Sequence, residues 1–331
     1  MIRPLVLVLV ALAWPAAASA APVRSAIFFY PWYSTAAHDG GYAHWQQGSH
    51  TPPWDIGSVY FPARGAYSSA DPHVLVAQMR DIRRARVDEV VSSWWGPGSP
   101  EDDRLPMIRR IARREGLNLA IQLEPYRGRS IASIGEDLVY LRGLGIHDVY
   151  VYRSEDFPAE AWATLPLKLS GVRTFAQTSR IGFAAKAGFD GFYTYDILVY
   201  GGDKFARLCA EAHAVKLLCA PSVGPGYDAE QATGDPNVKP RDNGATYDTM
   251  WRAAVAAGAD LVTITSYNEW SEGTQIEPAA SVPRRGAYRY ATYDGAYGLR
   301  GVAAETAYLD RTAYWTKAFA DASLARILYG P

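Results

Sequence analysis

Two glutamates, Glu269 and Glu272, are the residues of this sequence whose type and spacing best suit acid–base chemistry. They follow residues 261–267, where four consecutive β-branched residues predict a buried strand. In folds built of parallel strands, reactive groups gather at the carboxyl ends of the strands, so both carboxylates are expected at such an end. Asn268 and Trp270 flank the two acids. Acids that merely begin a helix or face water rarely need an amide and an aromatic ring beside them, so these neighbours favour a functional site.

Two carboxyl groups beside aromatic rings suit the hydrolysis of a glycosidic bond. One group must protonate the departing oxygen, and the other must activate a nucleophile or stabilise positive charge on the sugar. Glu269 and Glu272 can divide these roles if burial and repulsion raise the pKa of one above that of the other. The 10 Trp and 22 Tyr residues also favour sugar binding, because pyranose faces stack on aromatic rings. Residue types alone leave retention or inversion of configuration open.

Other chemistries fit the sequence less well. No Gly-x-Ser-x-Gly nucleophile motif is present, and the His residues lack the paired spacing of a zinc site, so we expect neither a metal nor another cofactor. A formal net charge of −1 gives no attraction to nucleic acid or anionic membranes. The expected partner is therefore an oligo- or polysaccharide substrate.

The elements that must position these residues alternate between strand and helix. Strands are expected over residues 25–30, 88–94, 117–124, 148–153, 172–176, 191–195, 216–220 and 261–267. Helices are expected over residues 72–86, 104–115, 134–144, 159–165, 181–187, 203–214 and 246–257, the first capped by Asp71. Eight such strands without a linker predict an α/β fold, a single (β/α)8 TIM barrel with long βα loops.

The first twenty residues are typical of a secretory signal peptide. Arg3 precedes an apolar run too short to span a bilayer, and a small-x-small site ends at Ala20. We therefore expect residues 21–331 to form the barrel domain of a monomeric protein that is secreted or periplasmic and leaves no segment in the membrane. Cys209 and Cys219 are expected either to pair or to remain as two buried thiols.

Six sequence strings, in order along the chain, resemble the endo-α-mannosidases of glycoside hydrolase family 99. These are YPWY (30–33), GAYSS (65–69), EPY (124–126), GFDGFYTY (188–195), PSVGPGY (221–227) and SYNEWSEGTQIE (266–277). The resemblance implies a (β/α)8 barrel that cuts within α-mannosides at an α-1,2 linkage, with retention and without a metal. It also implies that Glu269 acts as a base on the substrate's own 2-hydroxyl, giving a 1,2-anhydro sugar, and that Glu272 is the general acid and then the base for water.

The same resemblance implies the residues that line the substrate subsites. The expected substrate-binding residues are Tyr30, Trp95, Glu124, Tyr195, Tyr227, Arg241, Asn268 and Trp270. Ser271 replaces the usual His, Asp196 stands where an apolar residue is common, and the run before Arg241 differs from the family pattern. These departures bear on substrate preference, so a glycosidase for another α-linked polysaccharide and a non-catalytic carbohydrate-binding barrel stay as alternatives.

Overall fold

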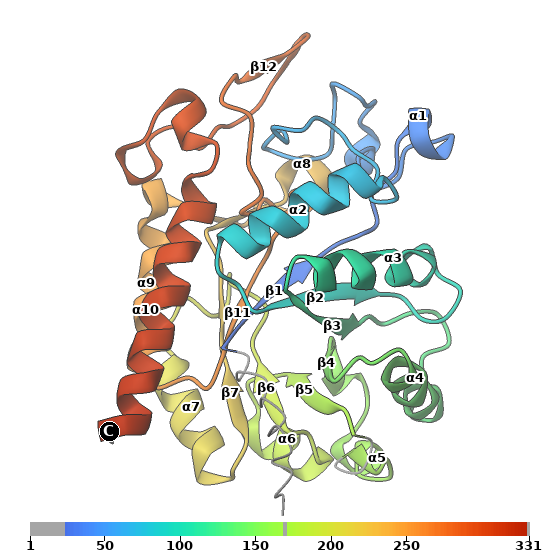
Figure 1. Ribbon diagram of the computed structural model, residues 1–331, viewed down its shortest axis with the longest axis vertical. Helices are drawn as coiled ribbons and strands as arrows, with labels where there is room; N and C mark the ends of the chain where they lie inside the picture. Colours follow the sequence, from blue (N-terminus) through green and yellow to red (C-terminus); the bar gives the residue numbers. More distant parts are fainter. Residues whose placement is uncertain (1–23, 168–170, 330–331) are drawn as a thin grey trace, which may run out of the picture.

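The computed structural model of the protein describes residues 24–167 and 171–329, so the expected signal peptide lies outside the described residues. Its main sheet has nine parallel strands in the order β7-β6-β5-β4-β3-β2-β1-β11-β8 (Figure 1). The strands are β1 (Ser25–Phe29), β2 (Glu89–Trp94), β3 (Asn118–Leu123), β4 (Asp148–Val151), β5 (Arg173–Gln177), β6 (Gly191–Tyr193), β7 (Leu218–Ala220), β8 (Ser222–Val223) and β11 (Val262–Ile264).

The sheet closes through a strand that is broken in two. Only Pro221 separates β7 from β8, and a proline interrupts a strand because it has no N–H to donate. The first half, β7, pairs with β6, whereas β8 pairs with β11, which itself pairs with β1. The nine strands are therefore the eight of a (β/α)8 barrel, and the predicted fold class is confirmed. All eight predicted strands are present, and the eighth ends at Ile264 rather than at residue 267.

Helices follow the strands around the outside of the barrel (Figure 1). The main ones are α2 (Pro72–Arg84), α3 (Pro100–Arg114), α4 (Ile131–Gly143), α5 (Ala159–Trp162), α6 (Ile181–Ala187), α7 (Phe205–Ala214), α9 (Ala245–Ala256) and α10 (Ala307–Tyr329). The predicted cap of the first is confirmed, because the Asp71 carboxylate accepts a hydrogen bond from the His73 N–H. The final helix, α10, was not predicted; it lies beside α9, to which Arg311 joins it through Asp248.

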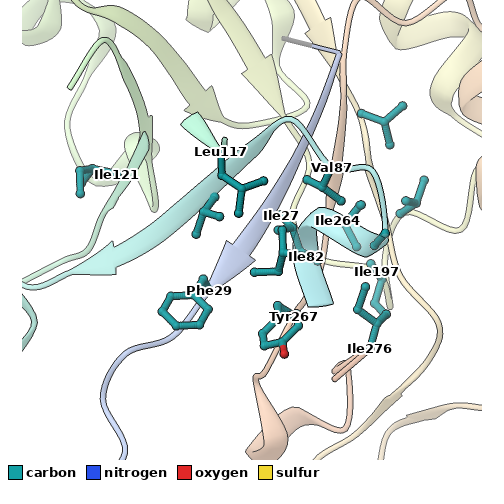
Figure 2. Close-up of a cluster of buried hydrophobic side chains, with 14 of the residues drawn as sticks. Ile27, Phe29, Ile82, Val87, Leu117, Ile121, Ile197, Ile264, Tyr267 and Ile276 are labelled. Atoms are coloured by element: carbon teal, nitrogen blue, oxygen red, sulfur yellow. The ribbon is translucent and has the colours of Figure 1, made fainter. Parts of the chain in front are cut away.

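The strands alternate between two buried layers, as a side-chain period of two requires. On β1, Ile27 and Phe29 point outwards and pack against the helices, and Figure 2 shows them near Ile82 of α2. Phe28 and Tyr30 point into the barrel instead. There they join an aromatic column that includes Tyr150, Phe175, Tyr193 and Tyr195. The barrel is thus filled rather than hollow, and its uppermost rings carry hydroxyl groups.

Long segments follow several strands at one end of the barrel. Figure 1 shows α1 (Ala36–Asp39), α8 (Glu230–Thr233) and the hairpin of β12 (Arg284–Arg285) and β13 (Tyr288–Arg289) at that end. A second small ribbon pairs β9 (Tyr227–Asp228) with β10 (Val238–Lys239).

Cys209 of α7 and Cys219 of β7 form a disulfide, with their Cα atoms 5.1 Å apart. Of the two outcomes expected for these cysteines, the structure has the paired one. Among the helices of the described ranges, none is both long and apolar enough to cross a membrane.

Candidate active site

Glu269 and Glu272 lie where the chain leaves β11 at the carboxyl end of the barrel. After β11 the chain enters a 3-10 turn, Trp270–Glu272, and the Ser266 hydroxyl accepts a hydrogen bond from the Glu269 N–H at 2.9 Å. Gly273 ends the turn with φ +63°, and a Cβ atom there would lie 2.8 Å from the Asp228 carbonyl oxygen. The backbone geometry therefore fixes where both carboxylates stand.

Glu269 is the deeper acid, with 6% of its surface exposed. The Tyr195 hydroxyl donates a hydrogen bond to its Oε2 atom at 2.5 Å, and the Tyr30 hydroxyl in turn bonds to that of Tyr195. Burial raises the pKa of Glu269 to about 7, against the hydrogen bond from Tyr195 and with help from the charge of Glu124. Burial and the Glu269 charge hold the pKa of Tyr195 well above its usual value, so its hydroxyl remains a donor.

Glu272 is half-buried and lines a pocket of about 240 Å³. Burial, followed by the charge of Glu269, holds the pKa of Glu272 well above its usual range. Both causes favour the protonated form of Glu272, which is the form that a general acid needs.

The pocket beside Glu272 has aromatic and polar walls. The other residues that line it are Tyr152, Gln177, Tyr195, Asp196, Ile197, Leu198, Tyr227, Asp235 and Thr265. The rings of Tyr152 and Tyr195 meet edge to face at 5.2 Å, and the Tyr227 hydroxyl donates to Asp235 at 2.9 Å. Flat rings combined with hydroxyl and carboxylate groups are what a sugar ring needs on its faces and edges.

A third buried acid, Glu124, follows β3 at the same end of the barrel. The Ser93 hydroxyl donates to its Oε1 atom at 2.8 Å, and burial raises the pKa of Glu124 to about 8. The charge of Glu124 raises the pKa of Glu269, and the charge of Glu272 raises the pKa of Glu124, so the three acids share one electrostatic environment. Trp95, after β2, is 37% exposed and is not among the residues that line the pocket.

Asn268 and Trp270 belong to the scaffold beneath the two acids. The Asn268 amide accepts from the Tyr30 N–H at 2.8 Å and donates to the Tyr30 carbonyl at 3.0 Å. The Trp270 indole N–H donates to Glu277 at 2.9 Å, a carboxylate that also accepts from Tyr67. Both residues are almost completely buried and neither lines the pocket. In the structure they support the loop that carries the acids.

Arg241 also lies behind the loop that carries the acids. Its Nη2 atom donates to the carbonyls of Gly273 at 2.9 Å and Gln275 at 2.7 Å. The rings of Tyr60, Tyr293 and Tyr308 surround its guanidinium group at 4.6–4.8 Å. Arg241 therefore stabilises the turn after Glu272, away from the pocket of Tyr227 and Glu272.

The site includes residues that were not expected from the sequence. Tyr152 lies near the end of the predicted strand 148–153, so the sequence places it at the rim but does not mark it as a substrate-binding residue. Gln177, at the end of β5, is likewise indicated only by its position at a strand end. Asp235 lies in a loop, where no sequence pattern indicates a role in the site. Within the described ranges, no group of three or more His, Cys, Asp or Glu side chains is placed to hold a metal ion.

The chain resembles known proteins over most of its length. The family model described as "Glycosyl hydrolase family 99" matches residues 23–321. A glycoprotein endo-alpha-1,2-mannosidase from Xenopus laevis is 33% identical, over 78% of this chain and 70% of its own length. A glycoprotein endo-alpha-1,2-mannosidase-like protein from Danio rerio is 34% identical, over 78% of this chain and 71% of its own length.

A solved structure gives the same result for the fold. The family 99 endo-alpha-mannosidase from Bacteroides thetaiotaomicron superposes with a TM-score of 0.80 and 28% identity, over 90% of this chain and 98% of its own. The family match spans all eight strands of the barrel and both carboxylates at its mouth. The chain therefore belongs to glycosyl hydrolase family 99 and is a glycoside hydrolase.

Proposed function

We propose that this glycoside hydrolase cleaves α-1,2-mannosidic linkages within a glycan and retains the anomeric configuration. Its relatives in Xenopus laevis and Bacteroides thetaiotaomicron are endo-α-mannosidases, which supports this substrate class. The main support for the proposal is that the two acids differ in their position relative to the pocket and in their pKa. Glu272 lines the pocket with a strongly raised pKa, whereas Glu269 lies deeper against Tyr195.

In the first step, Glu269 takes the proton of the 2-hydroxyl of the mannose at the cleavage point. The 2-oxygen attacks C1 and displaces the glycosidic oxygen, which receives its proton from Glu272, so that a 1,2-anhydro sugar forms. In the second step, the Glu272 carboxylate takes a proton from water, the water oxygen attacks C1, and the opened 2-oxygen recovers its proton from Glu269. Two inversions at C1 give net retention.

The hydrogen bond from Tyr195 supports the base role of Glu269. It opposes the rise in the pKa of Glu269 that burial causes, and so favours the ionised form that a base requires. Of the expected substrate-binding residues, Tyr195 and Tyr227 line the pocket and are proposed to contact the sugar bound there. Tyr30, Glu124 and Trp95 lie at the same end of the barrel outside the wall of this pocket, and we propose that they contact the substrate further along the glycan. For Asn268, Trp270 and Arg241 we propose positioning roles, because their polar atoms hold the loop and not the pocket wall.

Export from the cytoplasm, with cleavage of a signal peptide after Ala20, is part of the proposal, as is a monomeric state. The Cys209–Cys219 disulfide supports export, because disulfides persist in oxidising compartments. The mass of the mature protein from cells that make it should correspond to a chain starting at residue 21. A mass that includes residues 1–20 would contradict the cleavage.

The catalytic proposal is tested with a panel of α-linked oligosaccharides and the variants Glu269→Gln and Glu272→Gln. We expect the wild type to cleave α-1,2-mannosides and each variant to lose about a thousandfold or more in kcat while still binding, because each loses a transition-state role. Glu136→Gln, an exposed acid on α4, is the matched control. Turnover that survives Glu272→Gln would remove that residue from the acid role.

A further inference from the structure

The pocket beside Glu272 continues into a second hollow on the rim of the barrel. This hollow, about 350 Å³ in volume, shares Gln177 and Asp196 with the pocket of Glu272. Its other lining residues are Arg153, Glu155, Asp156, Thr178, Ser179, Arg180, Thr194, Val199 and Tyr200. We name it the distal hollow. A chain of sugars leaving the pocket between Gln177 and Asp196 would enter it directly.

The same rim loops build both cavities. After β4, Tyr152 lines the pocket and the next residue, Arg153, lines the distal hollow. The neighbouring strand β5 contributes its last residue, Gln177, followed by Thr178, and the loop after β6 contributes Asp196 and then Tyr200. Because β4, β5 and β6 are adjacent in the sheet, the two cavities lie side by side over three strand ends, with Gln177 and Asp196 in the walls of both.

The volumes of the two cavities indicate that a substrate extends beyond the pocket of Glu272. Cavities that bind small molecules usually measure about 300–1,000 Å³. The pocket of Glu272 alone, at about 240 Å³, falls below that range, whereas the distal hollow adds about 350 Å³. An enzyme that cuts within a glycan must also hold sugars on both sides of the cleaved bond.

The backbone of Arg153 is held in an unusual conformation that places it at the hollow. Its φ of +50° lies in the left-handed region, which costs a non-glycine residue free energy unless the surroundings fix it. The Gln177 side chain accepts from the Arg153 N–H at 2.8 Å, and Arg129 donates to the Arg153 carbonyl at 3.2 Å. Gln177 thus connects the wall of the pocket to the wall of the distal hollow.

The charges of the hollow suit a neutral ligand rich in hydroxyl groups. Arg153 donates to Asp156 at 3.2 Å, and Arg180 pairs with Glu155 at 2.9 Å. The side chains of Arg153 and Arg180 are 58% and 70% exposed, so further N–H groups face solvent. Arg129 also pairs with Asp156 at 3.0 Å, so with Asp196 three carboxylates face three guanidinium groups, and this balance suits an uncharged ligand.

We propose that the distal hollow is a remote subsite that binds neutral sugars of the glycan chain beyond those in the pocket of Glu272, through Arg153, Arg180 and Tyr200. The proposal rests on the proposed function, since it names how much of the glycan that site holds. It makes the enzyme selective for long chains over short ones. Binding of remote sugars contributes to catalysis because it holds the reacting sugar in place.

The test compares α-mannoside substrates of increasing length, from disaccharide to hexasaccharide, in wild type and in the double variant Arg153→Ala/Arg180→Ala. We expect kcat/KM of the wild type to rise with length, and the ratio of long to short to fall roughly tenfold in the double variant, as for one or two lost hydrogen bonds to a charged group. Arg207→Ala is the matched control, because that exposed arginine of α7 also pairs with a glutamate, Glu211. An unchanged ratio in the double variant overturns the proposal.

A binding measurement separates this proposal from the catalytic one. Titration calorimetry with the same oligosaccharides, on Glu272→Gln protein with and without the two Arg→Ala changes, reports affinity without turnover. If affinity rises with chain length and the double change removes that rise, the subsite is supported. This holds even if the wild type cleaves none of the oligosaccharides. Absence of cleavage would contradict the proposed function alone. Affinity that does not depend on length overturns the subsite.

Discussion

The pKa of Glu269 differs between the folded protein and the unfolded chain, because folding buries its carboxyl group. Its pKa rises from 4.5 to about 7 in the folded protein, so the folded state binds this proton more tightly than the unfolded chain does. For such a group the stabilisation is fully present below pH 4.5 and is lost as the pH rises through about 7. Keeping Glu269 ionised at the site therefore lowers the stability of the fold at alkaline pH.

This linkage predicts that Glu269→Gln stabilises the protein at alkaline pH. The neutral amide can still accept from Tyr195 but carries no charge to bury, so its free energy of unfolding should exceed that of the wild type by on the order of 2–3 kcal/mol above about pH 8. The difference should shrink towards about pH 4.5. Urea unfolding at several pH values measures it, with exposed Glu136→Gln as the control. A difference that is constant with pH would contradict the assignment.

At the scale of elements, the turn after β11 sets the position of Glu272. Gly273 has φ +63°, and its missing Cβ makes room for the Asp228 carbonyl on β9. Arg241 then holds the following loop segment by donating to the carbonyls of Gly273 and Gln275. Several contacts of the scaffold thus converge on one acid, although none of them touches the pocket.

We predict that Gly273→Ala lowers kcat at least tenfold, because the new methyl group forces the turn away from Asp228 and moves Glu272. Gly116→Ala is the matched control: its φ is +76°, yet a Cβ there meets nothing within 4 Å. Both changes carry the roughly 1 kcal/mol cost of a left-handed alanine. Steady-state kinetics and melting temperatures distinguish the two, and equal kcat values for both variants would show that the close approach is unimportant.

The disulfide between α7 and β7 should stabilise the folded protein. It closes a loop with a sequence separation of 10, which by chain entropy stabilises the fold by about 2–3 kcal/mol. Cys209→Ala/Cys219→Ala should lose this amount in urea unfolding. Wild type treated with a reductant should behave like the variant, and equal stability of oxidised wild type and variant would contradict the expectation.

The sequence predicted the strands well and the scaffold less well. The eight strands and the Asp71 cap follow from local signals, namely β-branched runs and an Asp-Pro helix start. The helix α10 was missed although its 23 residues contain neither Gly nor Pro. The break at Pro221 and the buried places of Arg241 and Trp270 depend on contacts between distant segments, which residue types and spacing do not report.

At the scale of the molecule, the barrel has a layered design. Aromatic side chains fill its interior, and the rings nearest the open end carry hydroxyls: that of Tyr195 donates to Glu269, and that of Tyr30 bonds to Tyr195. The long loops above them form the pocket and the distal hollow. A filled interior beneath a rim of long loops is the usual arrangement by which a (β/α)8 barrel carries its active site.

The most direct test of the proposed chemistry follows the first sugar product by proton NMR, using an α-1,2-linked mannoside and its analogue that lacks the 2-hydroxyl at the cleavage point. We expect the wild type to release the α-anomer first, and to bind the 2-deoxy analogue without cleaving it. Release of the β-anomer, or cleavage of the analogue at a rate similar to that of the parent, would contradict attack by the substrate's own hydroxyl with Glu269 as its base.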